Sequence, residues 1–425
     1  MFYMILAVAI FAITYILIMT EWINKMTAAL LGGFLVVVTG AISQGKAYQA
    51  VDWNVIFLLI GMMMVMGVLK QTGVFQYIAI KVAKFARAKP LYILLLMFSV
   101  TALVSAFLDN VTTVMILVPI ALLIASELKI TPIPYIITMA IASNIGGTAT
   151  IIGDPPNVMI GSATQYSFMD FIYHLTPAIV IVMVFSLVLT WLFFHKGMRV
   201  TNENRARLMN YKEDNLIANK KLLRRSLIVV TLMLVAFLFQ DKLHLAISTI
   251  AMVSGLILLL FSNRKRVENF LAHDIDWATI FFFIGLFIIV GSLIETGFIN
   301  LVSNKIMAVS SGDLRKTSVI ILWFSGIFSA FIDNVPFVAT MIPLIKSIGT
   351  HFPAQAMHPV WWALSLGACL GGNGTLIGAS ANIVSVGLAH KNGFSISFLD
   401  FTKIGVFYML LSLVLSTAYI LVRYF

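Results

Sequence analysis

The chain has little charge and a single cysteine. Asp, Glu, Lys and Arg together make up 11% of its 425 residues, less than half the usual share of a water-soluble domain. Its one cysteine, Cys369, excludes an internal disulfide framework. Acidic residues are scarcer than basic ones, 17 against 28, and basic residues do not interleave with aromatic ones. We therefore expect a basic cytoplasmic surface and no nucleic-acid partner.

Apolar residues dominate what is present. Hydrophobic residues make up 60% of the chain, and the mean hydropathy is +1.01. Long apolar runs occupy 2–19, 172–194 and 404–422, which is the length that spans a bilayer as a helix. The alternating pattern of a membrane β-barrel is missing, and the first run lacks the basic start and cleavage site of a signal peptide. The sequence predicts an all-α polytopic membrane protein.

The two halves of the chain repeat each other. Ser-Ala-Phe-Leu-Asp-Asn-Val at 105–111 recurs as Ser-Ala-Phe-Ile-Asp-Asn-Val at 329–335, which is 224 residues later. Chance matching of apolar runs does not align polar residues in this way, so the sequence indicates an internal duplication. Farther along the separation becomes 225, and the matched pairs are Gly147 and Gly372, Thr150 and Thr375, Gly153 and Gly378, and Asn157 and Asn382.

The matches predict a first transmembrane repeat at 1–195, a basic cytoplasmic linker at 196–225 and a second repeat at 226–425. Each repeat has three apolar spans, an interfacial stretch, a hairpin, a broken span and a final span. This amounts to about five spans plus a re-entrant hairpin in each half. Because an odd number of crossings separates the repeats, we expect them to have inverted topology.

The basic residues predict which side each loop occupies. If the N-terminus is outside, 21 of the 28 Lys and Arg residues lie in cytoplasmic loops, against 7 in the opposite orientation. Positive charge favours the cytoplasmic side. We therefore expect a multi-pass protein of a prokaryotic inner membrane with both termini outside.

Cysteine labelling tests this orientation. In a variant without Cys369, a cysteine at Lys212 should react only from the cytoplasm, and one at Lys305 only from outside. Impermeant maleimide on intact cells and on inside-out vesicles makes the measurement. Labelling of both positions from one side would exclude the inverted arrangement.

Asp109 and Asp333 are carboxylates in the middle of apolar stretches. An acidic side chain in hydrocarbon costs several kcal/mol, which makes each a candidate functional residue. Each lies at the centre of a segment, such as 91–126, whose two arms are short for full spans and therefore suggest a re-entrant hairpin. A structural carboxylate that caps a hairpin helix is the alternative, and the two roles are compatible.

The segments after the hairpins are too rich in Gly, Pro and polar residues for continuous helices. Asn144-Ile-Gly-Gly-Thr148 and Gly371-Gly-Asn-Gly-Thr375 predict helix breaks, whose free carbonyls suit a hard cation and whose half-helix N-termini suit an anion. Helix packing through small residues is the alternative. Asp154 has no counterpart, because Ala379 takes its place, which suggests a coupling cation in the first half or a plain loop residue.

Candidate Na⁺ ligands are Asp109, Asn110, Asn144 and Asn157. The whole set of candidate ion- and substrate-binding residues is Asp109, Asn110, Thr112, Thr113, Asn144, Gly146, Gly147, Thr148, Thr150, Asp154, Asn157, Asp333, Asn334, Gly371, Gly372, Asn373, Thr375 and Asn382.

These motifs resemble a known family. Ser-Ala-Phe-Leu-Asp-Asn-Val-Thr-Thr (105–113), Gly153-Asp-Pro-Pro-Asn-Val and Gly371-Gly-Asn-Gly-Thr-Leu-Ile-Gly-Ala-Ser-Ala-Asn382 resemble the pigmentation P protein and its prokaryotic relatives. Those proteins belong with arsenite pumps, sodium–proton antiporters and citrate-type carriers in the ion transporter superfamily. The resemblance covers nearly the whole chain. It implies an elevator-type motion of hairpins and broken helices against a scaffold, with Na⁺ and substrate held at the hairpin tips and helix breaks.

The resemblance and the residues together predict a secondary active transporter of small ions, coupled to H⁺ or Na⁺, and not an enzyme. We expect no cofactor, a homodimer in the lipid bilayer and most simply Na⁺/H⁺-linked transport. A carrier of arsenite or of a citrate-like organic anion is the alternative. Dicarboxylate carriers of the superfamily have Ser-Asn-Thr at both hairpin tips, where this chain has Asp-Asn-Val. An intramembrane aspartyl protease explains less, because it does not require the duplication. A channel explains less, because the sequence has no ring-like filter motif and broken helices in both halves favour alternating access.

Overall fold

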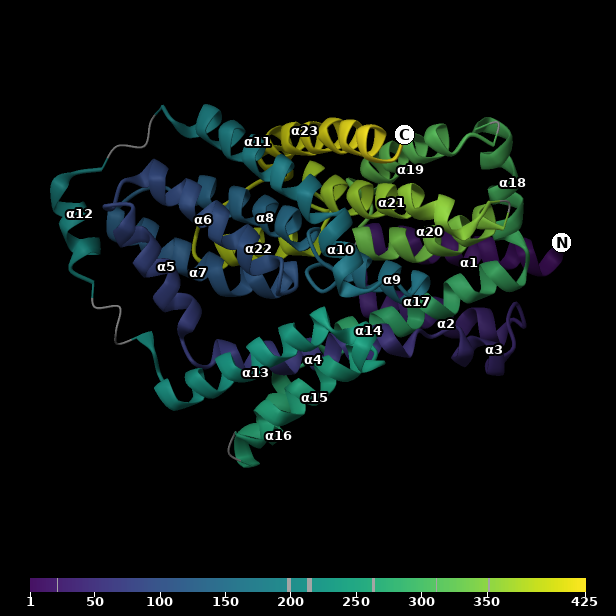
Figure 1. The fold of residues 1–425 in the computed structure, drawn as a ribbon, viewed down its shortest axis with the longest axis horizontal. Helices are drawn as coiled ribbons and strands as arrows, with labels where there is room; N and C mark the ends of the chain where they lie inside the picture. Colours follow the sequence, from purple (N-terminus) through teal and green to yellow (C-terminus); the bar gives the residue numbers. More distant parts are fainter. Residues whose placement is uncertain (21, 197–199, 212–215, 262–263, 311, 351) are drawn as a thin grey trace.

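The structure is a computed structural model that describes residues 1–425 except 21, 197–199, 212–215, 262–263, 311 and 351 (Figure 1). Regular structure in the described residues is entirely helical. The predicted all-α membrane fold is confirmed. Six of the described helices are long and apolar enough to cross a membrane, by length and composition, and five shorter apolar helices accompany them.

The first half of the chain contains eleven helices among its described residues. They are α1 (Phe2–Thr20), α2 (Lys25–Val38), α3 (Gln44–Gln49), α4 (Trp53–Lys70), α5 (Val74–Phe85), α6 (Pro90–Ser105), α7 (Asn110–Leu128), α8 (Ile133–Gly147), α9 (Pro155–Thr164), α10 (Phe168–His174) and α11 (Thr176–Phe194).

A short helix, α12 (Asn202–Met209), follows in the linker, and the second half resumes the same order. Its elements are α13 (Lys220–Leu238), α14 (Gln240–Leu243), α15 (Ile247–Leu260), α16 (Arg264–His273), α17 (Trp277–Glu295), α18 (Phe298–Ser310), α19 (Leu314–Ser329), α20 (Asn334–Gly349), η2 (Ala354–Met357), α21 (His358–Gly371), η3 (Gly372–Gly374), α22 (Ser380–Lys391) and α23 (Phe398–Tyr424).

Two groups of helices cross between the halves. In one, α2 packs along α17, and α15 packs along α4. In the other, α7 packs against α22, and α20 packs against α9. Within each half the helix before the hairpin turn lies along the broken helix, as α6 on α8 and α19 on α21. The halves are therefore interlocked at two places by equivalent pairs of helices.

Glycine permits the closest of these contacts. A Cβ on Gly61 in α4 would lie 2.6 Å from the carbonyl carbon of Ala251 in α15. A Cβ on Gly285 in α17 would lie 2.5 Å from the carbonyl oxygen of Ala29 in α2. Both distances are below any real carbon contact, so only glycine lets these backbones approach.

Substituting either glycine should loosen the interlock. We expect Gly61→Val and Gly285→Val each to destabilise the fold by about 1–3 kcal/mol, because the rigid backbone opposite cannot move aside. Gly387→Val is the matched control, since nothing lies within 4 Å of a Cβ there. Thermal unfolding of the detergent-solubilised protein makes the measurement. Equal midpoints for all three variants would refute the close packing.

Candidate functional site

Each hairpin turn ends on a carboxylate that caps the next helix. Asp109 is the N-cap of α7, and its Oδ1 accepts a hydrogen bond from the Thr112 amide at 2.8 Å. Asp333 is the N-cap of α20 and accepts from the Val335 amide at 3.1 Å. An N-cap carboxylate satisfies amides left free at a helix start and interacts favourably with the helix dipole. Both residues thus have the structural role considered above, and the second oxygen of Asp333 also accepts a hydrogen bond, from the Ser380 hydroxyl.

The helix breaks are closed by one asparagine in each half. Asn157 donates from Nδ2 to the carbonyl oxygens of Thr148 at 3.1 Å and Thr150 at 2.9 Å. Asn382 donates to those of Gly372 at 2.8 Å and Thr375 at 2.9 Å. Carbonyls at the end of a helix have no partner within the helix. These amides therefore replace the hydrogen bonds that each break removes.

Hydroxyl groups attach each hairpin to its broken helix. Thr150 Oγ1 donates to the Ala106 carbonyl at 2.5 Å, and Thr375 donates to the carbonyl of Ala330. Ser105 and Ser329 make the second pair of bonds, to the carbonyls of residues 143 and 368 at 2.7 and 2.6 Å. The same contacts occur in both halves, so hairpin and broken helix form one unit in each.

A buried amide network joins the two units. Asn110 Nδ2 donates to Asn144 Oδ1 at 3.0 Å, and Asn144 Nδ2 donates to the side-chain oxygens of Asn373 and Asn382, each at 3.0 Å. All four side chains are at most 3% exposed. Such a network is stable only when its members satisfy one another. The centre of the molecule is therefore a contact between the two helix breaks.

Asp154 is a fully buried carboxylate at the start of α9. It accepts from Asn334 Nδ2, at 3.1 Å to one oxygen and 3.4 Å to the other. It also lies within electrostatic reach of both Asp109 and Asp333. Three acids from two hairpins and one break thus face a common region, although the two halves contribute unequally.

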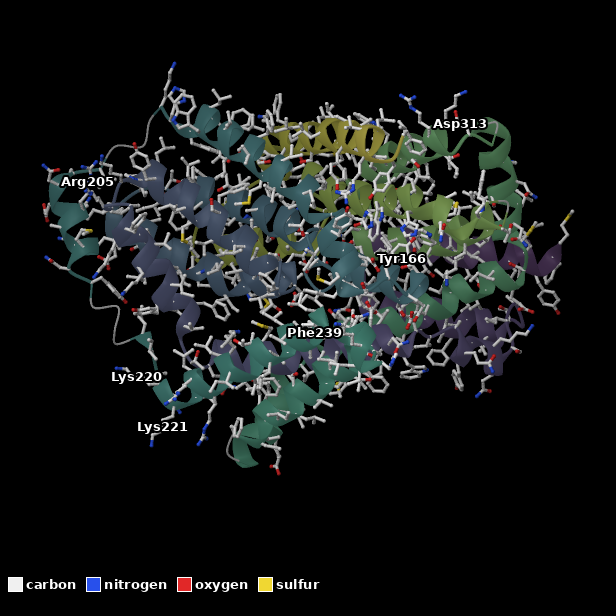
Figure 2. The ribbon with its side chains drawn as sticks, in the orientation of Figure 1. Tyr166, Arg205, Lys220, Lys221, Phe239 and Asp313 are labelled. Carbon is white, nitrogen blue, oxygen red and sulfur yellow. The ribbon has the colours of Figure 1, made fainter. Side chains whose placement is uncertain are left out.

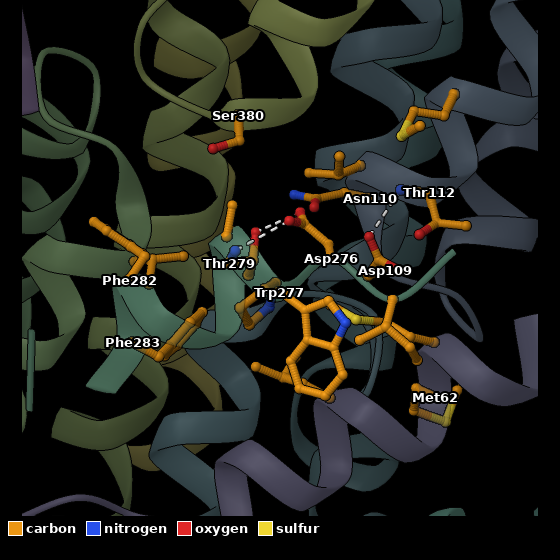
Figure 3. A pocket seen from close by; sticks show the side chains of 18 of the residues that line it. Met62, Asp109, Asn110, Thr112, Asp276, Trp277, Thr279, Phe282, Phe283 and Ser380 are labelled. Atoms are coloured by element: carbon orange, nitrogen blue, oxygen red, sulfur yellow. Dashed lines mark hydrogen bonds between the residues drawn. The ribbon is translucent and has the colours of Figure 1, made fainter. Parts of the chain in front are cut away.

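That region is a cavity of about 670 Å³. Both hairpin tips, the starts of α9 and α22, and the starts of α2 and α17 line it. Figure 3 shows Asp109 and Asp276 facing the space together, with Trp277 and Met62 along its wall. A second cavity of about 90 Å³ lies beside α4, α9 and the α14–α15 turn, and Asn54, Tyr166 and Gln240 line it. The space next to the site is therefore wide on one side and narrow on the other.

Most candidate residues of the sequence analysis divide between cavity and interior. The cavity wall contains Asp109, Asn110, Thr112, Asp154, Asp333 and Asn334. The interior of the breaks contains Asn144, Thr148, Thr150, Asn157, Asn373, Thr375 and Asn382. Thr113 is buried in α7, and its hydroxyl has no partner among the described residues.

The four candidate glycines lie at close backbone contacts. A Cβ on Gly147 would come within 2.5 Å of the Gly153 carbonyl oxygen, and one on Gly372 within 2.8 Å of that of Gly378. Gly146 and Gly371 face the hairpin backbone at 1.9 and 2.3 Å in the same way. At these four positions the structure shows close packing of backbones, which is the alternative that the sequence analysis gave to ion binding.

The cavity wall also contains Asp276, Lys25 and Ser380, which were not among the candidates. Lys25 Nζ donates to Ser380 Oγ at 2.7 Å, and Asp276 Oδ2 accepts from the Thr279 hydroxyl at 2.6 Å. The repeated Asp-Trp phrase at 275–277 could have identified Asp276, whereas nothing in the sequence distinguishes Lys25.

Replacing the asparagines that close the breaks should destabilise the fold. Asn157→Leu and Asn382→Leu keep the side-chain size but leave two buried carbonyls unsatisfied, at about 1–3 kcal/mol for each carbonyl. Asn392→Leu is the control, because its amide bonds the Leu388 carbonyl in an exposed position. We expect thermal midpoints to fall clearly for the first two variants only. A midpoint of Asn382→Leu equal to that of Asn392→Leu would contradict the closing role.

The fold and cavity define a membrane transporter, and comparisons with known proteins agree. Residues 15–367 match the model of a family described as citrate transporter, CitMHS, so the chain belongs to that family. An uncharacterized transporter of Mycobacterium tuberculosis (strain ATCC 25618 / H37Rv) is 40% identical over 427 residues, covering 99% of both chains. The P protein of Mus musculus is 30% identical over 503 residues, covering 98% of this chain and 60% of that protein.

A solved structure is similar in fold. The YdaH transporter of Alcanivorax borkumensis, described as having an unusual topology, superposes with a TM-score of 0.60 at 14% identity. The similarity covers 92% of this chain and 87% of that one. The resemblance inferred from the motifs is thus confirmed, and the chain is a transporter rather than an enzyme.

Proposed function

We propose that this protein is a secondary active transporter that couples a small ion to Na⁺ or H⁺ through Asp109 and Asp154. The observation that supports it is the set of three buried or half-buried acids around one cavity between interlocked halves. A carboxylate removed from water requires a compensating charge or proton. Asp109 and Asp154 form no ion pair within the part of the chain that the structure describes. A mobile cation is the natural partner for them.

The hydrogen bonds favour some oxygen ligands over others. The side-chain oxygen of Asn144 accepts from Asn110, and that of Asn157 accepts from Ser365 at 2.6 Å. Asn110 lines the cavity, and its side-chain oxygen accepts no hydrogen bond from the described residues. We therefore assign a Na⁺ to Asp109, Asn110 and Asp154, whose oxygens suit a hard cation. Asn144 and Asn157 would support the site by holding the break.

The unequal cavities support alternating access. The helices α2, α4, α15 and α17 form one interlocked group, and the hairpins with their broken helices form another. Motion of the second group against the first, as in an elevator, would widen the narrow cavity and close the wide one. With the N-terminus outside, the wide cavity opens to the cytoplasm, because Lys70 and residues 272–276 line it.

The arrangement of the helices supports the proposed orientation. The N-terminus, α3 and α18 lie at one end of the long axis, and α5 and α12 lie at the other (Figure 1). Figure 2 shows Arg205, Lys220 and Lys221 extending from the second end, far from Asp313. That end would face the cytoplasm of a prokaryotic inner membrane. We retain two inverted repeats, at 1–195 and 226–425, and a homodimer as parts of this proposal.

A small anion is the favoured transported species. The start of α22, which has no side-chain cap, lines the cavity. Free backbone amides at a helix start favour negative charge. The family description favours a citrate-like anion, whereas the Asp-Asn-Val hairpin tips differ from those of dicarboxylate carriers. Arsenite and simple exchange of Na⁺ for H⁺ are the alternatives for this site.

Flux in proteoliposomes tests the proposal. We expect Asp109→Asn and Asp154→Asn to lower cation-driven uptake about tenfold or more, since tenfold corresponds to only about 1.4 kcal/mol of lost binding. Radiolabelled citrate, arsenite and sodium are the probes, under imposed Na⁺ and pH gradients. Asp52→Asn is the matched control. Asp52 caps α4 by accepting a hydrogen bond from the Asn54 amide at 3.1 Å, and it does not line the wide cavity. Wild-type flux that ignores both gradients would refute cation coupling.

A further inference from the structure

Lys25 connects the two groups of helices inside the wide cavity. Its Nζ donates to Ser380 Oγ at 2.7 Å and lies 3.7 Å from Asp333 Oδ2. Ser380 Oγ donates in turn to the same Asp333 oxygen at 2.5 Å. The carboxylate side chain is only 11% exposed, and that of the lysine is 39% exposed. A compact ammonium group with three donors is suited to this geometry.

The three residues come from different parts of the fold. Lys25 begins α2, which packs along α17, whereas Asp333 and Ser380 stand at the starts of α20 and α22. Phe282 of α17 lies 5.6 Å from Nζ and shields the ammonium on its own side. The charge therefore reaches the second hairpin tip from the neighbouring helix group, and the second half needs no ion from solution to neutralise Asp333.

The hairpin tip of the first half has no ammonium group of this kind beside it. Ala29 meets Gly285 as Ala251 meets Gly61, so Ile247 stands at the position that corresponds to Lys25, and Pro155 at the one that corresponds to Ser380. Asp109 instead faces Asp276 and Asp154, all three of them acids. Matched carboxylates thus have opposite surroundings, one beside a fixed cation and one among acids that repel each other.

We propose that Lys25 is a tethered cation that occupies the second coupling-ion position, so that the carrier binds one mobile cation where two matched halves would bind two. The inference rests on the proposed function and specifies its stoichiometry. Lys25 keeps Asp333 neutralised in the empty and the loaded carrier alike. The mobile cation then binds on the side of Asp109 and Asp154 only. Lys25 is a positioning residue for the charge balance and not a ligand of that mobile ion.

Removing the ammonium should create a second Na⁺ site. We expect Lys25→Gln to bind one Na⁺ more per chain than the wild type, by equilibrium dialysis of purified protein at pH 8.5. The variant should bind two Na⁺ per chain where the wild type binds one. If the wild type couples to protons alone, the variant should bind one Na⁺ per chain and the wild type none. Lys25→Arg keeps the charge and should gain none. The double variant Lys25→Gln, Asp333→Asn also removes the carboxylate that has lost its ammonium partner, and it should not have the added Na⁺ site. A purely structural role of Lys25 would not change this count.

Restoring the charge within one protein gives a second test that does not depend on comparing folds. In a Cys369→Ala background, Lys25→Cys should show the additional Na⁺. Modification with an aminoethyl thiosulfonate, which adds an ammonium group, should abolish it. Modification with the neutral methyl reagent should leave it. An unchanged Na⁺ count in Lys25→Gln and in unmodified Lys25→Cys would overturn the proposal, even where wild-type flux depends on a cation gradient.

Discussion

The cost of keeping carboxylates out of water governs the centre of this protein. Asp109 and Asp333 cap helices, and Asp154 stands at the start of a third. A helix that begins in the interior requires the chain to break there, and a break leaves carbonyls without partners. Asn157 and Asn382 satisfy those carbonyls, and glycine lets the flanking backbone pack closely. In the first half the break, its amide bonds and its glycines accompany a buried acid at a helix start, whereas in the second half Ala379 takes the place of that acid.

The same cost makes the surroundings of the two hairpin carboxylates important, and these surroundings differ although the two halves have similar folds. The Asp333 carboxylate has a hydroxyl and an ammonium beside it, whereas Asp109 has a backbone amide and further acids. Substitutions at Asp154, Lys25 and Ser380 are enough to make that difference. In a low-dielectric site, one added or missing charge outweighs many shared packing contacts. The charge around each hairpin carboxylate therefore depends on a few positions at which the repeats differ.

The sequence predicted the helical class, the family and six polar residues of the cavity wall, because repeated polar phrases inside apolar runs have few physical explanations. It did not predict Lys25, since a lysine near a span end is ordinary and its partner Ser380 lies 355 residues away. The sequence also suggested Asn157 as an ion ligand through its amide oxygen. An amide side chain has a donor nitrogen as well as this acceptor oxygen. Which one is used depends on the carbonyls that the fold brings near.

The central amide network makes the two halves of the chain unequal. Asn144 bridges to Asn373 and Asn382 across the halves, whereas its counterpart Cys369 makes a weak contact to Asn157 at 3.7 Å. A dimer of two identical second halves would place thiols at both positions and lack both Asp154 and Lys25. A dimer of two first halves would contain Lys25 twice but lack Ser380. The two halves are therefore not interchangeable.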